Sequence, residues 1–135
     1  MPAPRSADSL NDLSSKVLAG AVAVHRALGP GLLETAYAAC LEHELRAMDL
    51  EVARQVPIPL IYRGMRMRCA YRADLIVEQA MLLEVKAIDV LSPLHAQQLY
   101  TYLRLVDYRL GLLLNFGAPT LRQGIKRVVN NFPER

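Results

Sequence analysis

The first third of the chain repeats its apolar residues at helical spacing. With Ser9 or Asn11 as a cap, this spacing predicts a helix that ends at Gly29-Pro30-Gly31. The apolar stripe of this helix comprises Leu13, Val17, Leu18, Ala21, Val24 and Leu28. A second helix follows at once, with an inner stripe of Leu33, Tyr37, Cys40, Leu41, Leu45 and Met48. Residues 1–8 are rich in Pro, Ala and Ser and are expected to be a flexible leader, so residues 9–135 form the single folded domain.

From Glu51 onward the pattern changes to the shorter repeat of β-strands. Residues 54–62 predict a strand that its two prolines restrict to a sheet edge or a bulged position, and residues 65–77 and 81–88 predict two more. Ser92 and Pro93 begin a helix that continues to about Val106, and residues 109–116 predict a buried strand. Residues 121–129 predict a strand or a helical turn. This order predicts an α/β fold, with a mixed central β-sheet flanked by helices.

Charged residues interrupt the apolar strands at the centre of this pattern. Asp74 lies in one strand, and Glu84 and Lys86 lie two residues apart in the next. Alternation places Glu84 and Lys86 on one face of the sheet, whereas Leu83 and Val85 take the other. Buried charges are tolerated only when they are paired or hold an ion. One interpretation is therefore a structural ion pair, which joins Lys86 or Arg72 to one of the two acids. The other interpretation is a metal site.

The metal interpretation has a definite chemistry. Phosphodiester cleavage with Mg²⁺ or Mn²⁺ needs hard oxygen ligands and an activated water. Asp74 and Glu84 would supply two carboxylates, and Lys86 could orient the water or stabilise charge on the phosphate. Glu34, near the start of the second helix, is the candidate for a third acid. Its alternative role is a favourable interaction with the helix dipole.

Two further sets of residues are candidates for substrate binding. Gln98 and Tyr102 are four residues apart and so share a face of the helix that crosses between the last two strands. Arg66, Arg68 and Arg72 share the strand parity of Asp74 and could form a track for phosphate groups. For the arginines, a solvated strand face is the alternative.

Composition narrows the classes of protein without selecting one. A chain of 135 residues with 53% hydrophobic and 21% charged residues is expected to be globular, and its net charge of +3 suits a polyanionic partner. No apolar run is long enough to span a bilayer, and the N-terminus lacks the apolar core of a signal peptide. We therefore expect a cytoplasmic protein without a membrane partner. Cys40 and Cys69 lack metal-ligand spacing and are expected in the core.

Several motifs, taken together, resemble a known family. Gly31-Leu32-Leu33-Glu34-Thr35-Ala36-Tyr37 matches the GxxExxY motif, and the preceding segment 24–30 matches VHxxLGP. Further matches follow in order at residues 71–75, 84–87, 98–103 and 114–116. Over roughly residues 14–131 the chain resembles the GxxExxY protein family, which is assigned to the PD-(D/E)XK nuclease-like superfamily.

The resemblance implies a restriction-endonuclease-like core and a role for each matching residue. Asp74 and Glu84 would be the metal ligands, helped by Glu34 and the Val85 carbonyl. Lys86 would be the catalytic lysine. Gln98 and Tyr102 are similar to the QxxxY helix motif of RecB-like and phage-exonuclease-like nucleases.

The expected function is therefore a Mg²⁺- or Mn²⁺-dependent nuclease that acts on DNA and leaves a 5′-phosphate. The alternative is a non-catalytic nucleic-acid-binding or accessory module on the same fold, because fold membership does not establish an activity. A weaker third hypothesis is a metal-binding protein that acts on another phosphate ester. We also expect a homodimer, since a small nuclease core gains contact area by dimerising.

Overall fold

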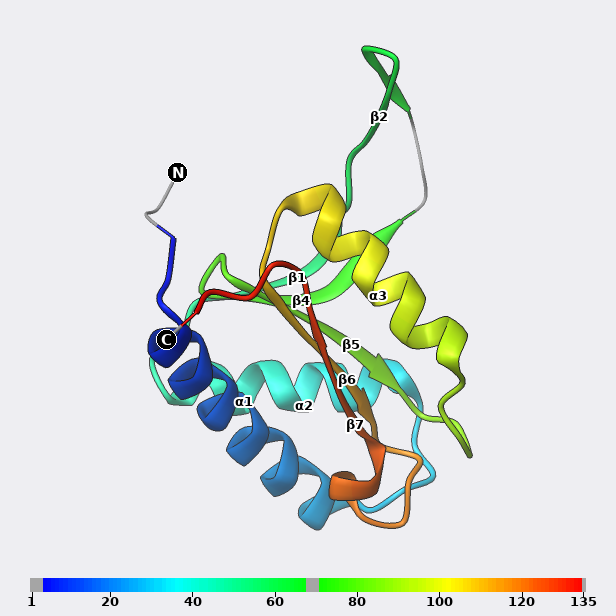
Figure 1. The fold of residues 1–135 in the computed structure, drawn as a ribbon. Coiled ribbons are helices and arrows are strands. Elements are labelled where there is room, and N and C mark those ends of the chain that lie inside the picture. The colour runs from blue at the N-terminus through cyan, green and yellow to red at the C-terminus, as the bar shows by residue number, and fades with distance from the viewer. Residues whose placement is uncertain (1–3, 68–70, 135) are drawn as a thin grey trace.

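A central sheet of five strands has the order β1-β4-β5-β6-β7 (Figure 1). In this computed structural model, which describes residues 4–67 and 71–134, the β5–β6 pair is parallel and the other three pairs are antiparallel. The five strands are β1 (Val52–Pro57), β4 (Arg72–Val77), β5 (Met81–Lys86), β6 (Leu110–Asn115) and β7 (Ile125–Val129). The predicted mixed sheet is confirmed, and the proline-containing strand β1 is at its edge.

Helices cover both faces of this sheet (Figure 1). α1 (Ala7–Leu28) and α2 (Glu34–Ala47) pack on one face, where Leu83 and Val85 join their core. α3 (Pro93–Val106) packs on the other face against Leu82 and crosses between the parallel strands β5 and β6, as predicted. Before β7 the chain forms a short 3₁₀ helix, η1 (Leu121–Gly124). Over the described residues, none of the helices is long and apolar enough to cross a membrane.

α1 begins earlier than the sequence pattern predicted. Ser6, and neither Ser9 nor Asn11, is the N-cap, and its side chain accepts a hydrogen bond from the Ser9 N–H at 3.1 Å. Arg5 forms a salt bridge of 3.2 Å with Glu78 at the β4–β5 turn. Residues 5–8 are therefore part of the folded domain, and the prediction of a flexible leader is wrong for them. Residues 1–3 lie outside the described part of the chain.

Two predicted strands each divide in the structure. β2 (Leu60–Tyr62) and β3 (Met65–Met67) pair with each other in a separate hairpin, and β4 starts only at Arg72. Because Pro59 has no N–H to donate to a ladder, the chain leaves the sheet after β1. Arg66 therefore does not lie on the strand of Asp74, so the parity argument fails for it. Arg68 and Cys69 lie outside the described residues.

The predicted inner stripe of the second helix is wrong at two positions. α2 begins at Glu34, so Leu33 is its N-cap and is exposed. Cys40 is also exposed, because the buried side chains of α2 form a narrower stripe. That stripe comprises Tyr37, Ala38, Leu41 and Leu45.

Candidate functional site

Strands β4 and β5 separate at the point where their acidic residues lie. Their regular pairing ends at Leu75 and Leu83, which places Asp74 opposite Glu84 just beyond the ladder. Beyond that point, side-chain carboxylates and not main-chain carbonyls accept the hydrogen bonds between the two strands. The Asp74 N–H donates to Glu84 Oε1 at 3.3 Å, and the Val85 N–H donates to Asp74 Oδ2 at 2.8 Å. These two crossed hydrogen bonds hold both carboxylates together at the end of the ladder.

The Glu84 carboxyl lies in an environment that disfavours its charge. Glu84 is only 8% exposed to solvent. Burial raises the pKa of Glu84 to about 8, the Asp74 carboxylate adds to this increase, and the Lys86 ammonium opposes it. A cation bound between the two acids would reverse the effect, because it favours both ionised forms.

Lys86 ends β5, and the parity of the strand places it on the same face as Glu84. Among the described residues, the salt bridges include none between Lys86 or Arg72 and either Asp74 or Glu84. Arg72 is exposed and donates instead to the Gln55 carbonyl at 3.4 Å. The structural ion pair that was the alternative interpretation is therefore not formed in the described part of the chain.

The crossover helix brings Tyr102 beside the two acids. Tyr102 is buried, and Gln98, one turn earlier on the same helix, is exposed. Burial raises the pKa of the Tyr102 phenol, and Glu84, Tyr71 and Asp74 add to the increase. The phenol therefore remains a hydrogen-bond donor beside the carboxylates. The structure thus brings Tyr102 to the acids, and Gln98 as a site residue stays a prediction.

Tyr71 is a neighbour of the site that the sequence reasoning missed. Its ring centroid lies 5.7 Å from that of Tyr102, with the planes at 49°. Tyr71 is partly exposed and directly precedes β4. An aromatic residue just before the strand of Asp74 was the available signal, but only the packing of α3 shows that it meets Tyr102.

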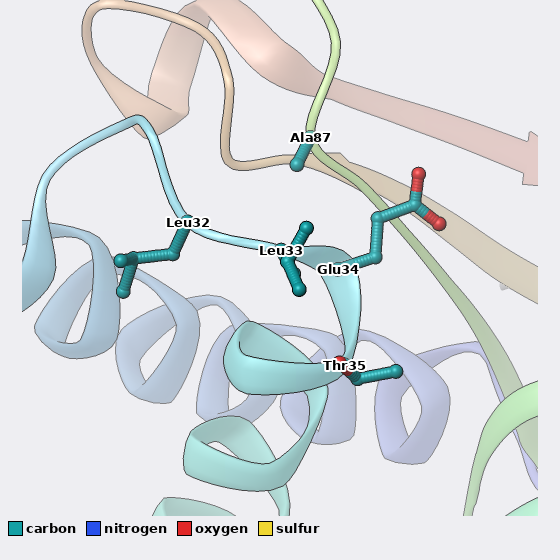
Figure 2. A pocket seen from close by; sticks show the side chains of 5 residues that line it. All are labelled: Leu32, Leu33, Glu34, Thr35 and Ala87. Carbon is teal, nitrogen blue, oxygen red and sulfur yellow. The ribbon is translucent and has the colours of Figure 1, made fainter.

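Glu34 lies near the end of β5, at the margin of the site. It is the first residue of α2 and, with Leu32, Leu33, Thr35 and Ala87, lines a hollow of about 350 Å³. Its carboxylate points away from Leu32 and Thr35 (Figure 2). Over the described residues, Glu34 does not gather with Asp74 and Glu84 into a group of three side chains that could hold a metal. The structure therefore brings Asp74 and Glu84 together, and Glu34 as a third ligand stays a prediction.

The loop before Glu34 is held by Tyr37, the last residue of the GxxExxY motif. The buried Tyr37 hydroxyl donates to the Gly29 carbonyl and accepts from the Leu32 N–H at 3.1 Å. Its ring stacks on Phe116, with centroids 4.6 Å apart. The loop needs glycine at Gly31, where φ is +114°. This tyrosine therefore holds the loop that leads into Glu34.

A buried amide clamps the segment that follows Lys86. Asn115 Oδ1 accepts from the Ile88 N–H at 3.0 Å and the Gly117 N–H at 3.1 Å, and its Nδ2 donates to the Ile88 carbonyl at 2.9 Å. A Cβ on Gly117 would lie 2.3 Å from the Ile88 carbonyl oxygen, so only glycine fits there. The signal for Asn115 was one polar residue at the end of an apolar run. The sequence reasoning assigned it no role.

The pair of acids fits a hard divalent cation. Over residues 4–67 and 71–134, no three His, Cys, Asp or Glu side chains gather into a group that could hold a metal. Mg²⁺, however, is commonly bound through one or two carboxylates, with waters and substrate phosphates as the other ligands. Asp74 and Glu84 meet that requirement by themselves. The Val85 carbonyl as a further ligand stays a prediction.

Comparison with known proteins agrees with this arrangement. A family model described as the PD-(D/E)XK nuclease superfamily matches residues 11–128, which include all of the sheet except the end of β7. No curated protein and no solved structure matches. The family model describes the superfamily and does not test the smaller GxxExxY family that the motifs resemble. The fold, the two adjacent acids with their lysine and the extent of this match lead to one conclusion: the chain belongs to the PD-(D/E)XK nuclease superfamily.

Proposed function

We propose that this protein is a divalent-metal-dependent nuclease that hydrolyses phosphodiester bonds in DNA. One observation carries the proposal. Asp74 and Glu84, from neighbouring strands, are joined by crossed hydrogen bonds where the β4–β5 ladder ends, and one of them is buried. Two carboxylates so close together repel each other, so the arrangement is favourable when a cation binds between them.

Each residue of the site has a separate role around that cation. Asp74 and Glu84 would hold Mg²⁺ or Mn²⁺, with Glu34 and the Val85 carbonyl as candidates for further ligands. When bound, the cation supplies Lewis-acid stabilisation of charge on the phosphate and makes water a better nucleophile. Lys86 orients the attacking water or stabilises the phosphate.

Substrate binding involves the helix and the start of β4. Tyr102, whose raised pKa keeps its phenol protonated, donates a hydrogen bond to the substrate, and Gln98 contacts a phosphate or a base. Arg72, exposed two residues before Asp74, binds a neighbouring phosphate. Water attacks the phosphorus in line with the O3′ leaving oxygen, the P–O3′ bond breaks, and the products are a 5′-phosphate and a 3′-hydroxyl.

The test is cleavage of labelled single- and double-stranded DNA in Mg²⁺, Mn²⁺ or EDTA. We expect wild-type protein to cut with metal and not with EDTA. Asp74→Asn is expected to reduce the rate by at least about a hundredfold. Loss of a residue that only hydrogen-bonds to a metal ligand already costs about 10–100-fold, and loss of the ligand itself should cost more. Asp12→Asn is the matched control, since Asp12 is exposed on α1.

A different outcome would identify the protein as an accessory module. In that case wild-type protein binds DNA but cuts it with none of the metals. Its affinity for DNA is then the same in EDTA and in the Asp74→Asn variant. That combination would contradict the nuclease proposal.

A further inference from the structure

The β2–β3 hairpin extends away from the sheet, on the side of α3 (Figure 1). Every residue from position 61 to position 67 is exposed. Ile61 is 65% exposed, Tyr62 58% and Met65 64%. An isolated two-stranded hairpin is marginally stable in water, and exposed apolar side chains add to that difficulty. The hairpin therefore presents a surface that a partner would complete.

The two faces of the hairpin differ in chemistry. Leu60 pairs with Met67, and Tyr62 pairs with Met65, so these side chains share one face of the hairpin. Ile61 and Arg66 pair on the opposite face. At the tip, the Arg63 guanidinium lies 5.4 Å from the centroid of the Tyr62 ring.

 The face that carries Tyr62 and Met65 is therefore an apolar and aromatic platform, with the Arg63 guanidinium at its end.

Charge selects the kind of partner. Residues 52–73 contain five arginines and no Asp or Glu. Two copies of this hairpin would bring like charges together, whereas a polyanion is complementary to it. The arginines of this segment are Arg54, Arg63, Arg66, Arg68 and Arg72.

The hairpin is also connected to the site of the two acids. At its base, the Ile58 N–H donates to the Tyr71 carbonyl at 2.9 Å. The Tyr71 ring contacts that of Tyr102, and Asp74 follows three residues later, on β4. A nucleic acid that reached the acids could therefore extend along this side of the molecule to the hairpin.

We infer that the β2–β3 hairpin is a second nucleic-acid contact, and that it binds unpaired nucleotides. Tyr62 stacks on a base, with the Arg63 guanidinium beside the ring, and Arg66 neutralises a phosphate. A base offers its face to a protein ring only where it is unstacked, so this contact favours single strands over blunt duplexes. The inference rests on the proposed function for its substrate, and it narrows that substrate to DNA with a single-stranded segment.

The test is fluorescence anisotropy with labelled oligo-dT and with a blunt duplex, in EDTA so that no strand is cut. We expect Tyr62→Ala to weaken oligo-dT binding about tenfold and duplex binding far less. Arg66→Ala is expected to weaken both and to reduce the salt dependence by about one ion. Tyr100→Ala is the matched control, because Tyr100 is exposed on α3 and has Arg104 6.0 Å from its ring centroid.

Three results would overturn the inference. Tyr62→Ala could bind oligo-dT as tightly as wild type. It could lose affinity equally for the duplex, which would indicate insertion into a groove. Alternatively, Tyr62→Ala could convert a dimer to a monomer in sedimentation with DNA affinity unchanged, which would assign the hairpin to a second copy of the chain. Thermal melting checks that each variant is folded.

The two proposals fail in different ways. If wild-type protein cuts DNA with metal but Tyr62→Ala binds oligo-dT normally, only the hairpin inference fails. If no metal supports cutting but Tyr62→Ala still loses oligo-dT affinity, only the nuclease proposal fails.

Discussion

At the scale of single residues, Asp74 and Glu84 hold each other in place but oppose each other's charge. Each carboxylate accepts a main-chain N–H from the partner strand. Burial, and then Asp74, raise the pKa of Glu84 from 4.5 to about 8. An acid whose pKa is higher in the folded state binds its proton more tightly there. Its contribution therefore favours folding below about pH 4.5 and is lost as the pH rises through about 8.

This shift predicts how stability depends on pH in EDTA. The free energy of unfolding should fall between about pH 5 and pH 8 by an amount on the order of a few kcal/mol. Glu84→Gln should remove most of that fall, because an amide does not titrate. Urea denaturation at a series of pH values measures it, with Glu134→Gln at an exposed site as the control. Equal slopes for wild type and Glu84→Gln would contradict the assignment of the shift to Glu84.

At the scale of elements, the end of β6 fixes the position of the end of β5. Lys86 pairs with Asn115 in the parallel ladder, and the Phe116 N–H donates to the Lys86 carbonyl at 2.8 Å. The Asn115 side chain then binds both main-chain groups of Ile88. The lysine is thus held from behind by a strand that contributes no catalytic group.

Asn115→Ala is expected to lower the free energy of unfolding by about 2–3 kcal/mol, because it leaves the main-chain groups of Ile88 without these partners. DNA cleavage should fall as well, since the end of β5 is less well held. Urea denaturation and the cleavage assay measure the two effects. Asn11→Ala is the control, because it removes an exposed hydrogen bond between the side chains of Asn11 and Arg127. Unchanged stability for Asn115→Ala would contradict the clamp.

The elements themselves were largely predictable, because their signals are local. Ser92 and Pro93 mark the start of α3, and the apolar run 109–116 marks the buried strand β6. The division of the predicted strand 65–77 was not predictable from alternation. No proline or glycine interrupts this segment, and only the pairing of β3 with β2 shows that its first part leaves the sheet.

Part of the candidate site was predictable, because charged residues are unusual in apolar strands. Asp74, Glu84 and Lys86 are such residues, and β5 places Glu84 and Lys86 on one face, as expected. The contact between Tyr71 and Tyr102 depends on how α3 packs, which no local pattern encodes. The position of Glu34 likewise depends on where α2 meets the sheet. Tertiary packing therefore decides which neighbours complete the site.

At the scale of the whole molecule, stability and chemistry are assigned to different faces of the sheet. The larger core lies between the sheet and the helices α1 and α2. Strand parity places Glu84 and Lys86 with Leu82 on the opposite face, which α3 covers, and the hairpin extends on the side of α3 (Figure 1). Substitutions on that second face can therefore alter chemistry without removing the main core.

Lys86→Ala provides the most direct test of the central claim, that these residues form a metal-dependent nuclease site. Cleavage rates with Mg²⁺ or Mn²⁺ are compared for wild type, Lys86→Ala and Lys16→Ala, a control at an exposed position of α1. We expect Lys86→Ala to remain folded and to lose on the order of 10²–10⁴-fold in rate, with Lys16→Ala unchanged. Cleavage by Lys86→Ala at the wild-type rate would contradict the account.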